Sequence, residues 1–159
     1  MLKEDFKYRL SAIINVCKMH NQRMQYAMDF IQGIFPLDSE SYRVLTQEQI
    51  SHTDQLIYRF SQLQDTIGGK LFPLILRGLG EYDQNMPFID ILNRLEKISV
   101  IDSAEHWLIL RETRNLVTHE YPDNEKEIVE GLNELHKQSQ YLSSILDGLM
   151  GYIRERGWI

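Results

Sequence analysis

The sequence predicts an all-α protein, an up-down bundle of four to five helices with one core. Apolar residues recur at three- and four-residue steps along most of the 159 residues, which is the period of an amphipathic helix. No segment alternates apolar and polar residues as a half-buried strand would. The composition, 43% hydrophobic and 25% charged, is ordinary for a globular domain, so we expect residues 1–159 to form a single domain.

A long first helix is expected over residues 3–33. Gly33 and Pro36 should end it, because glycine favours helix C-termini and proline cannot continue a helix. The short polar segment 38–43 is expected to be a connection. The apolar stripe of this helix comprises Phe6, Leu10, Ile13, Ile14, Cys17, Met24, Met28 and Ile31.

A second long helix should begin near Ser51 or earlier, where Asp54 stands three residues on as in a capping box. The pair Gly68-Gly69 and Pro73 should bend or split this helix. Its inward residues are expected to be Leu56, Ile57, Phe60, Leu63, Ile67, Leu71, Leu74 and Ile75.

The clearest loop spans residues 78–87, which include Gly78, Gly80, Asn85 and Pro87. A shorter helix over residues 88–98 should follow it. Ser103 is a good N-cap for the next helix, which Pro122 should end or kink.

The last helix should begin at Asp123 or Asn124, either of which can cap it, and run to about Arg156. Its apolar stripe comprises Ile128, Leu132, Leu135, Tyr141, Leu142, Ile145, Leu149 and Ile153. With this helix the predicted bundle is complete.

Charge and targeting signals narrow the class of protein. The net charge of −6 argues against a broad electrostatic attraction to nucleic acid, so any such recognition should be local or a partner should supply the positive surface. No apolar run reaches the roughly 18 residues that span a bilayer, and the N-terminus has no apolar signal core. We therefore expect a cytoplasmic protein with no membrane association.

Neither a metal nor a cofactor is expected. The single Cys17 falls on an apolar stripe and cannot alone hold zinc, and none of the remaining histidines shows ligand spacing (His20, His52, His106 and His136). Gly68-Gly69-Lys70 lacks the spacing and the preceding strand of a phosphate-binding loop. The chain should therefore not bind ATP itself.

One segment combines residue types that could take part in catalysis. Arg114, His119 and Tyr121 place a fixed cation, a group that titrates near neutral pH and a phenol within about two helical turns. A phosphodiester would find there both a charge clamp and a proton-transfer group.

A helical wheel at about 100° per residue places Arg111, Arg114, Asn115, Thr118 and His119 on one side of this helix. Ile109, Leu110, Thr113, Leu116 and Val117 share the other side. Arg114 and His119 are about 140° apart, so one ideal helix cannot aim both at one atom. A two-fold dimer that sets two such helices side by side would bring the Arg of one subunit near the His of the other.

Each residue of the run also has a structural interpretation. Arg114 would then form a salt bridge, for instance with Glu112 or Glu120 of a neighbouring subunit. His119 would be a surface or hydrogen-bonded structural residue. Tyr121, which precedes a proline, would pack at the helix end.

The run Arg114-Asn115-Leu116-Val117-Thr118-His119-Glu120-Tyr121 resembles the signature of the HEPN superfamily, in which Arg and a polar residue precede a His. Tyr121 makes it similar to the HepT branch, the toxins that pair with a minimal nucleotidyltransferase antitoxin. The all-helical plan and the segment 59–65, which looks like a helix of such nucleotidyltransferase partners, extend the resemblance. The chain is longer than a minimal HepT, with an extended first helix and the 78–87 loop.

The resemblance implies a metal-independent endoribonuclease toxin that works as a homodimer on an RNA substrate. His119 would act as general base and acid, Arg114 would stabilise the phosphorane, and Asn115 would orient His119 or the phosphate. Tyr121 would receive AMP from the nucleotidyltransferase, and the added charge and bulk would block Arg114. Arg111 and Thr118 would support the site from the same polar face.

Two other functions remain open from the residues. The chain could be a non-catalytic helical subunit that binds substrate or completes a site for a separate nucleotidyltransferase. It could also be a structural dimer, in which the run is only an interfacial salt-bridge network. The second long helix carries three charged residues, Asp54, Arg59 and Asp65. They are expected to form solvated or inter-helix ion pairs, or alternatively to support the active face.

Overall fold

The computed structural model describes residues 3–118 and 124–159, and these ranges contain helices and no strands. The all-α prediction is therefore confirmed. The helices are α1 (Glu4–Ile31), α2 (Ser39–Arg43), α3 (Gln47–Thr66), α4 (Phe72–Gly78), α5 (Phe88–Lys97), α6 (Ala104–Thr118) and α7 (Glu125–Glu155). A 3-10 turn, Gln32–Ile34, follows α1, and a π-helical segment, Ile67–Leu71, joins α3 to α4.

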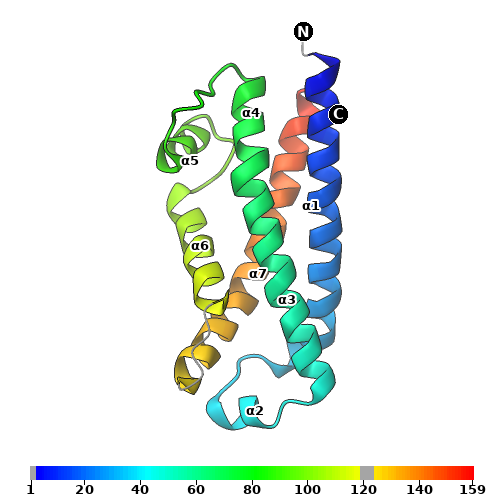
Figure 1. Ribbon diagram of the computed structural model, residues 1–159, viewed down its shortest axis with the longest axis vertical. Helices are drawn as coiled ribbons and strands as arrows, with labels where there is room; N and C mark the ends of the chain where they lie inside the picture. Colours follow the sequence, from blue (N-terminus) through cyan, green and yellow to red (C-terminus); the bar gives the residue numbers. More distant parts are fainter. Residues whose placement is uncertain (1–2, 119–123) are drawn as a thin grey trace.

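The long helices run alternately down and up, as predicted for an up-down bundle (Figure 1). From the N-terminal end of the molecule α1 runs down, the α3–α4 rod returns up the centre, α6 runs down and α7 returns behind them. The short helix α2 lies at the lower end, and α5 lies beside the upper parts of α4 and α6. Both chain ends therefore lie at the same end of the bundle.

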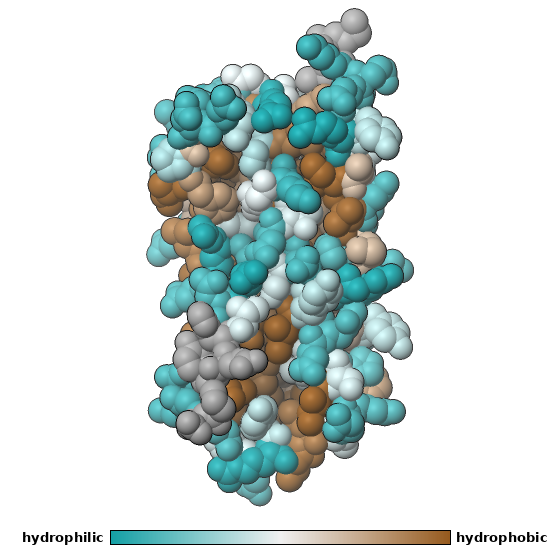
Figure 2. All heavy atoms as spheres, viewed as in Figure 1, coloured by the Kyte–Doolittle hydropathy of each residue, from teal (hydrophilic) through white to brown (hydrophobic). Residues whose placement is uncertain are grey.

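One core holds the long helices together. Leu10, Met24, Phe60 and Leu142, from α1, α3 and α7, are fully buried, and Trp107 from α6 is 1% exposed. Apolar area removed from water contributes roughly 25 cal/mol per Å² to folding, so this shared core is the main source of stability. The surface around it is mostly hydrophilic on the face drawn in Figure 2.

The segment 38–43 was expected to be a connection, and this expectation was wrong. It contains α2, whose capping box pairs the Ser41 amide with Asp38 Oδ1 at 2.7 Å and the Asp38 amide with Ser41 Oγ at 2.9 Å. Asn133 of α7 then exchanges two hydrogen bonds with the backbone of Leu37. A helix of five residues is too short to show a period, and only its cap could have revealed it.

The second long helix begins earlier than Ser51, as the sequence allowed, but the capping box at Ser51 and Asp54 was wrongly predicted. Helix α3 begins at Gln47 after the N-cap Thr46, whose side chain accepts from the Gln49 amide at 3.1 Å while Gln49 Oε1 accepts from the Thr46 amide. The capping box is therefore Thr46 with Gln49, and Ser51 and Asp54 lie inside the helix. Glutamine serves the third position of this box as well as an acid does.

The later helix ends agree with the sequence. The His106 amide donates to Ser103 Oγ at 3.0 Å, as expected for an N-cap, and Asn124 Oδ1 accepts from the Glu127 amide at 3.2 Å. Pro122 and Asp123, which were also expected to shape this junction, lie outside the described residues. No helix in the described ranges is long and apolar enough to cross a membrane.

Gly68 and Gly69 were expected to bend or split the second long helix, and the α-helix is divided there: α3 ends at Thr66, α4 begins at Phe72, and a wider π-helical segment lies between them. The rod continues through the π-helical segment into α4 (Figure 1), and Pro73 falls in the first turn of α4. A Cβ atom on Gly68 would lie 3.1 Å from Trp107 Cζ2 and 3.5 Å from Phe88 Cζ. The absence of a side chain at Gly68 is therefore what lets α6 dock against the rod.

Gly68→Ala and Gly69→Ala form a matched pair of variants. An alanine at Gly69 meets no atom within 4 Å, so it should stabilise the helix by up to about 1 kcal/mol. An alanine at Gly68 must displace the buried Trp107 ring, which should cancel that gain and leave this variant at least about 1 kcal/mol less stable than Gly69→Ala. Urea unfolding of both proteins measures the difference, and equal stabilities would contradict this account of the rod.

Candidate functional site

The candidate site lies on the last two turns of α6, which pack between the α3–α4 rod and α7. Arg111, Arg114, Asn115 and Thr118 are described there. The catalytic and modification positions proposed from the sequence, His119 and Tyr121, lie outside the described residues. The described residues therefore contain the arginine half of the predicted site.

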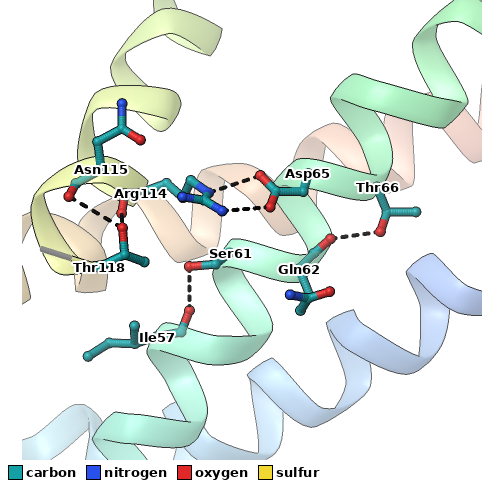
Figure 3. Close-up of polar contacts among 8 residues, drawn as sticks. All are labelled: Ile57, Ser61, Gln62, Asp65, Thr66, Arg114, Asn115 and Thr118. Atoms are coloured by element: carbon teal, nitrogen blue, oxygen red, sulfur yellow. Dashed lines mark hydrogen bonds and ion pairs between the residues drawn. The ribbon is translucent and has the colours of Figure 1, made fainter.

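Arg114 reaches across to α3 and forms a two-point ion pair with Asp65 (Figure 3). Nε donates to Oδ1 at 2.9 Å and Nη2 donates to Oδ2 at 2.8 Å. The side chains are 32% and 46% exposed, so the pair lies at the surface of the bundle. Since the partner belongs to the same chain, the ion pair with Glu112 or Glu120 of a neighbouring subunit is not needed to explain Arg114.

The ion pair uses only one edge of the guanidinium. An arginine side chain has five N–H donors, and the bonds to Asp65 occupy the edge formed by Nε and Nη2. Nη1 donates to no other group among the residues that the structure describes. The hydrogen bonds to Asp65 also raise the pKa of Arg114, so the guanidinium stays charged. Arg114 is thus oriented by Asp65 and keeps donors for an anion at its outer edge.

Arg111 occupies a different place from Arg114. Its guanidinium carbon lies 4.8 Å from the centre of the Phe88 ring at the start of α5, in a cation–π contact. Phe88 is a contact that the sequence did not predict, because nothing in the local pattern says which loop returns to α6. Arg111 therefore lies beside Arg114 on the surface of α6, and its contact with Phe88 orients it toward α5.

The two polar residues after Arg114 do not converge on it. The Thr118 hydroxyl donates to the Arg114 carbonyl oxygen at 2.8 Å, so it is engaged by its own helix. The Asn115 side chain is exposed and points away from the Arg114–Asp65 pair (Figure 3). The structure therefore places Arg111, Arg114, Asn115 and Thr118 on neighbouring parts of one surface without joining them at one point.

The buried side of α6 is rotated about the helix axis relative to the apolar side that the helical wheel predicted. Leu110 and Thr113 are buried as expected, but Ile109 and Leu116 are 39% and 42% exposed. They line an open groove of about 430 Å³ between α6 and α7, together with Thr113, Gly131, Glu112, Glu127, Glu130 and Glu134. Trp107, on the preceding turn, is buried and its ring packs against the π-helical segment at Gly68.

This groove gives the two sides of α6 opposite charge. Four glutamates line the groove side, whereas Arg111 and Arg114 lie toward α3 and α5. A polyanion is repelled by the first side and attracted by the second. Any phosphate ligand of α6 is therefore expected on the arginine side.

Arg59, at the start of the segment 59–65, turns away from α6. Its Nη1 donates to Nδ1 of His20 on α1 at 2.9 Å, which requires His20 to be an acceptor at that nitrogen. Burial lowers the pKa of His20, and the positive charges of Arg59 and Arg23 lower it further. Of these two charged residues of α3, Asp65 contacts the arginine side of α6 and Arg59 does not.

Within the described ranges, no group of three or more histidine, cysteine or carboxylate side chains is arranged to hold a metal ion. A scan against protein-family models and searches of curated proteins and of solved structures found no match for this chain. The site is therefore interpreted from its own residues.

The Arg114–Asp65 pair should make a small contribution to stability. Exposed ion pairs contribute about 0.2–1 kcal/mol, and a two-point geometry favours the upper part of that range. A double-mutant cycle with Arg114→Ala and Asp65→Ala, measured by urea unfolding, should give a coupling free energy of about 0.5–1 kcal/mol. A coupling near zero would show that the two side chains do not hold each other in solution.

Proposed function

We propose that this chain is a metal-independent endoribonuclease of the HEPN type and the toxin of a toxin–antitoxin pair. In this proposal a partner nucleotidyltransferase neutralises the toxin by transferring AMP to Tyr121. The support is the spacing of Arg114, Asn115, His119 and Tyr121 in an all-helical chain, together with the position of Arg114 on the bundle surface.

The observation that carries the proposal is the outer edge of Arg114. Asp65 fixes the guanidinium through Nε and Nη2 and leaves the two N–H groups of Nη1 directed elsewhere. A guanidinium that is already oriented loses little entropy when it binds a phosphate, and its planar donors match two phosphate oxygens. Asp65 is in this view a positioning residue.

The reaction needs only groups from RNA and from the protein. His119 removes the proton from a 2′-hydroxyl, and the oxygen attacks the adjacent phosphorus to form a phosphorane. Arg114 stabilises the added negative charge. The bond from phosphorus to the 5′-oxygen then breaks, a protonated His119 donates a proton to that oxygen, and the products are a 2′,3′-cyclic phosphate and a 5′-hydroxyl.

A homodimer fits this chemistry. Arg114 and His119 point about 140° apart on an ideal helix, so a phosphate between them is best reached from two copies of α6. The arginine side of α6 is the side available for such pairing, since the glutamate-lined groove would set like charges against each other. The net charge of −6 also implies that RNA binding is weak and local.

Cleavage of total RNA in EDTA tests the catalytic assignment. His119→Ala should reduce the rate by about 10²–10⁴-fold, because the proton-transfer group is lost. Arg114→Lys should reduce it by about 10²–10³-fold, because lysine cannot provide paired planar donors. Arg77→Lys, an exposed arginine on α4, is the control and should retain full activity. Cleavage by the wild type no greater than by His119→Ala would contradict the proposal.

Co-expression with a cognate nucleotidyltransferase tests the modification. Mass spectrometry of the purified chain should find one added AMP on the peptide that contains Tyr121, and RNA cleavage should stop. Tyr121→Phe should escape both the modification and the loss of activity. If the wild type is neutralised while Tyr121 stays unmodified, inhibition occurs by binding alone.

A non-catalytic role as a partner subunit of a nucleotidyltransferase is the second candidate. It is favoured by the same ion pair, because Asp65 already neutralises Arg114 and gives it a structural function. In that case Arg114→Lys should be harmless and no cleavage should be found in any variant.

A further inference from the structure

Helix α1 carries a line of exposed hydrophobic side chains on the side away from the core. Their exposed fractions are 77% for Tyr8, 41% for Val16, 36% for Met19, 72% for Tyr26 and 49% for Phe30. Single exposed apolar residues need no explanation, but several of them along one side of a helix indicate a contact surface. Hydrophobic atoms interrupt the hydrophilic surface along α1 in Figure 2.

The spacing of this line is that of a helix-pairing seam. From Tyr8 the steps lead to Ala12, Val16, Met19, Arg23, Tyr26 and Phe30, and are four, four, three, four, three and four residues. At about 100° per residue all seven fall within an arc of roughly 80°. Steps of three and four residues place side chains along the seam of a coiled coil. Arg23 is the only charged member, and we call this set the α1 seam.

We infer that the α1 seam binds the α1 seam of a second copy of this chain, with the two helices antiparallel. In the register that the side chains favour, Met19 lies opposite Arg23 of the other copy. Val16 then lies opposite Tyr26, and Ala12 lies opposite Phe30.

Size and charge both select the antiparallel arrangement. Of the residues that this register pairs, the small ones, Ala12 and Val16, lie in the first half of the seam, and the large ones, Tyr26 and Phe30, lie in the second half. Reversing one helix therefore sets small against large, as close packing requires. Tyr8 would lie opposite residue 34, beyond the end of α1, and stays outside the paired stretch. A parallel pair would set Arg23 against Arg23 and Phe30 against Phe30, which places like charges together and leaves gaps around the small residues.

The polar residues beside the seam also suit a second copy. One flank carries Asn15, Gln22 and Asp29, and in the antiparallel register Asn15 faces Asp29 while Gln22 faces itself. An amide can donate to a carboxylate, and two amides can bond each other, so no like charges meet on this flank.

Helix α3 already orders the C-terminal end of the α1 seam. His52 of α3 stacks on the Phe30 ring with centres 3.8 Å apart, and its Nδ1 lies 2.8 Å from the Glu48 carbonyl oxygen. The Tyr26 ring lies 6.0 Å from the same imidazole. Side chains held in place before binding lose less entropy in the complex, so this end of the seam is prepared for contact.

This interface goes beyond the proposed function, because α1 lies on the opposite side of the bundle from α6 (Figure 1). Pairing through α1 leaves the arginine side of α6 uncovered in both copies. The two surfaces can therefore be altered separately, and the α1 seam can be tested whether or not the chain cleaves RNA.

The oligomeric mass tests the inference. Ala12→Glu with Val16→Glu should raise the dissociation constant of the copies at least about tenfold per substitution, because each carboxylate would be buried opposite an aromatic ring without a cation to pair with. Sedimentation equilibrium should then give half the mass of the wild type at the same concentration. Ile89→Glu on α5, where the side chain is 44% exposed, is the control and should keep the wild-type mass.

Disulfide cross-linking tests the register. A mixture of Met19→Cys and Arg23→Cys chains should form a covalent pair on oxidation, since opposite residues of paired helices lie within disulfide reach. Each variant alone should cross-link much less. Cys17 does not interfere, because it is buried and burial raises the pKa of its thiol to about 12.

Three results would overturn the inference. They are a wild type that stays monomeric at high concentration, an Ala12→Glu, Val16→Glu protein with unchanged mass and native helicity, and efficient cross-linking of each cysteine variant with itself. Circular dichroism of every variant separates a lost interface from a lost fold, and the seam residues are exposed enough that the monomer should fold.

Discussion

The docking of α6 on the α3–α4 rod depends on one contact, the Trp107 ring against the backbone of Gly68. The buried indole packs against the π-helical segment Ile67–Leu71 at Gly68, where no side chain stands in its way. The centre of the Phe72 ring lies 4.7 Å from the centre of the Trp107 ring. The contact at Gly68 sets how far α6 is rotated about its axis. That rotation brings Arg114 within reach of Asp65 and turns Ile109 and Leu116 outward.

The sequence was a good guide to whatever depends on local pattern. Periodicity and caps predicted the four long helical rods and their order, and Ser103 and Asn124 were identified as caps from residue type alone. The helix α2 was missed because it is shorter than two turns, and the capping box of the second long helix was assigned to Ser51 and Asp54 although Thr46 and Gln49 fit the same pattern. Spacing describes a helix without saying what it touches.

The candidate site shows the same limit more sharply. The wheel placed Arg114 on a polar face, but only the packing of α6 revealed that Asp65, 49 residues earlier, is its partner. It also assigned Ile109 and Leu116 to the core, because a wheel assumes that one whole side of a helix is covered. Here the adjacent part of α7 presents glutamates, which stay solvated and leave the groove open. Residue types thus suggested a chemistry, and tertiary contacts decide which groups can take part in it.

The hydrogen bond from Arg59 to His20 makes the contact between α1 and α3 sensitive to acid. Nδ1 of His20 can accept this bond only while it carries no proton, and the folded environment lowers the pKa of His20. The unfolded chain therefore binds a proton more readily than the folded one, so the contribution is complete above the ordinary histidine pKa of about 6.5 and is lost as the pH falls below it. Acidification should accordingly weaken the contact between α1 and α3, where a cation would face Arg59 and Arg23.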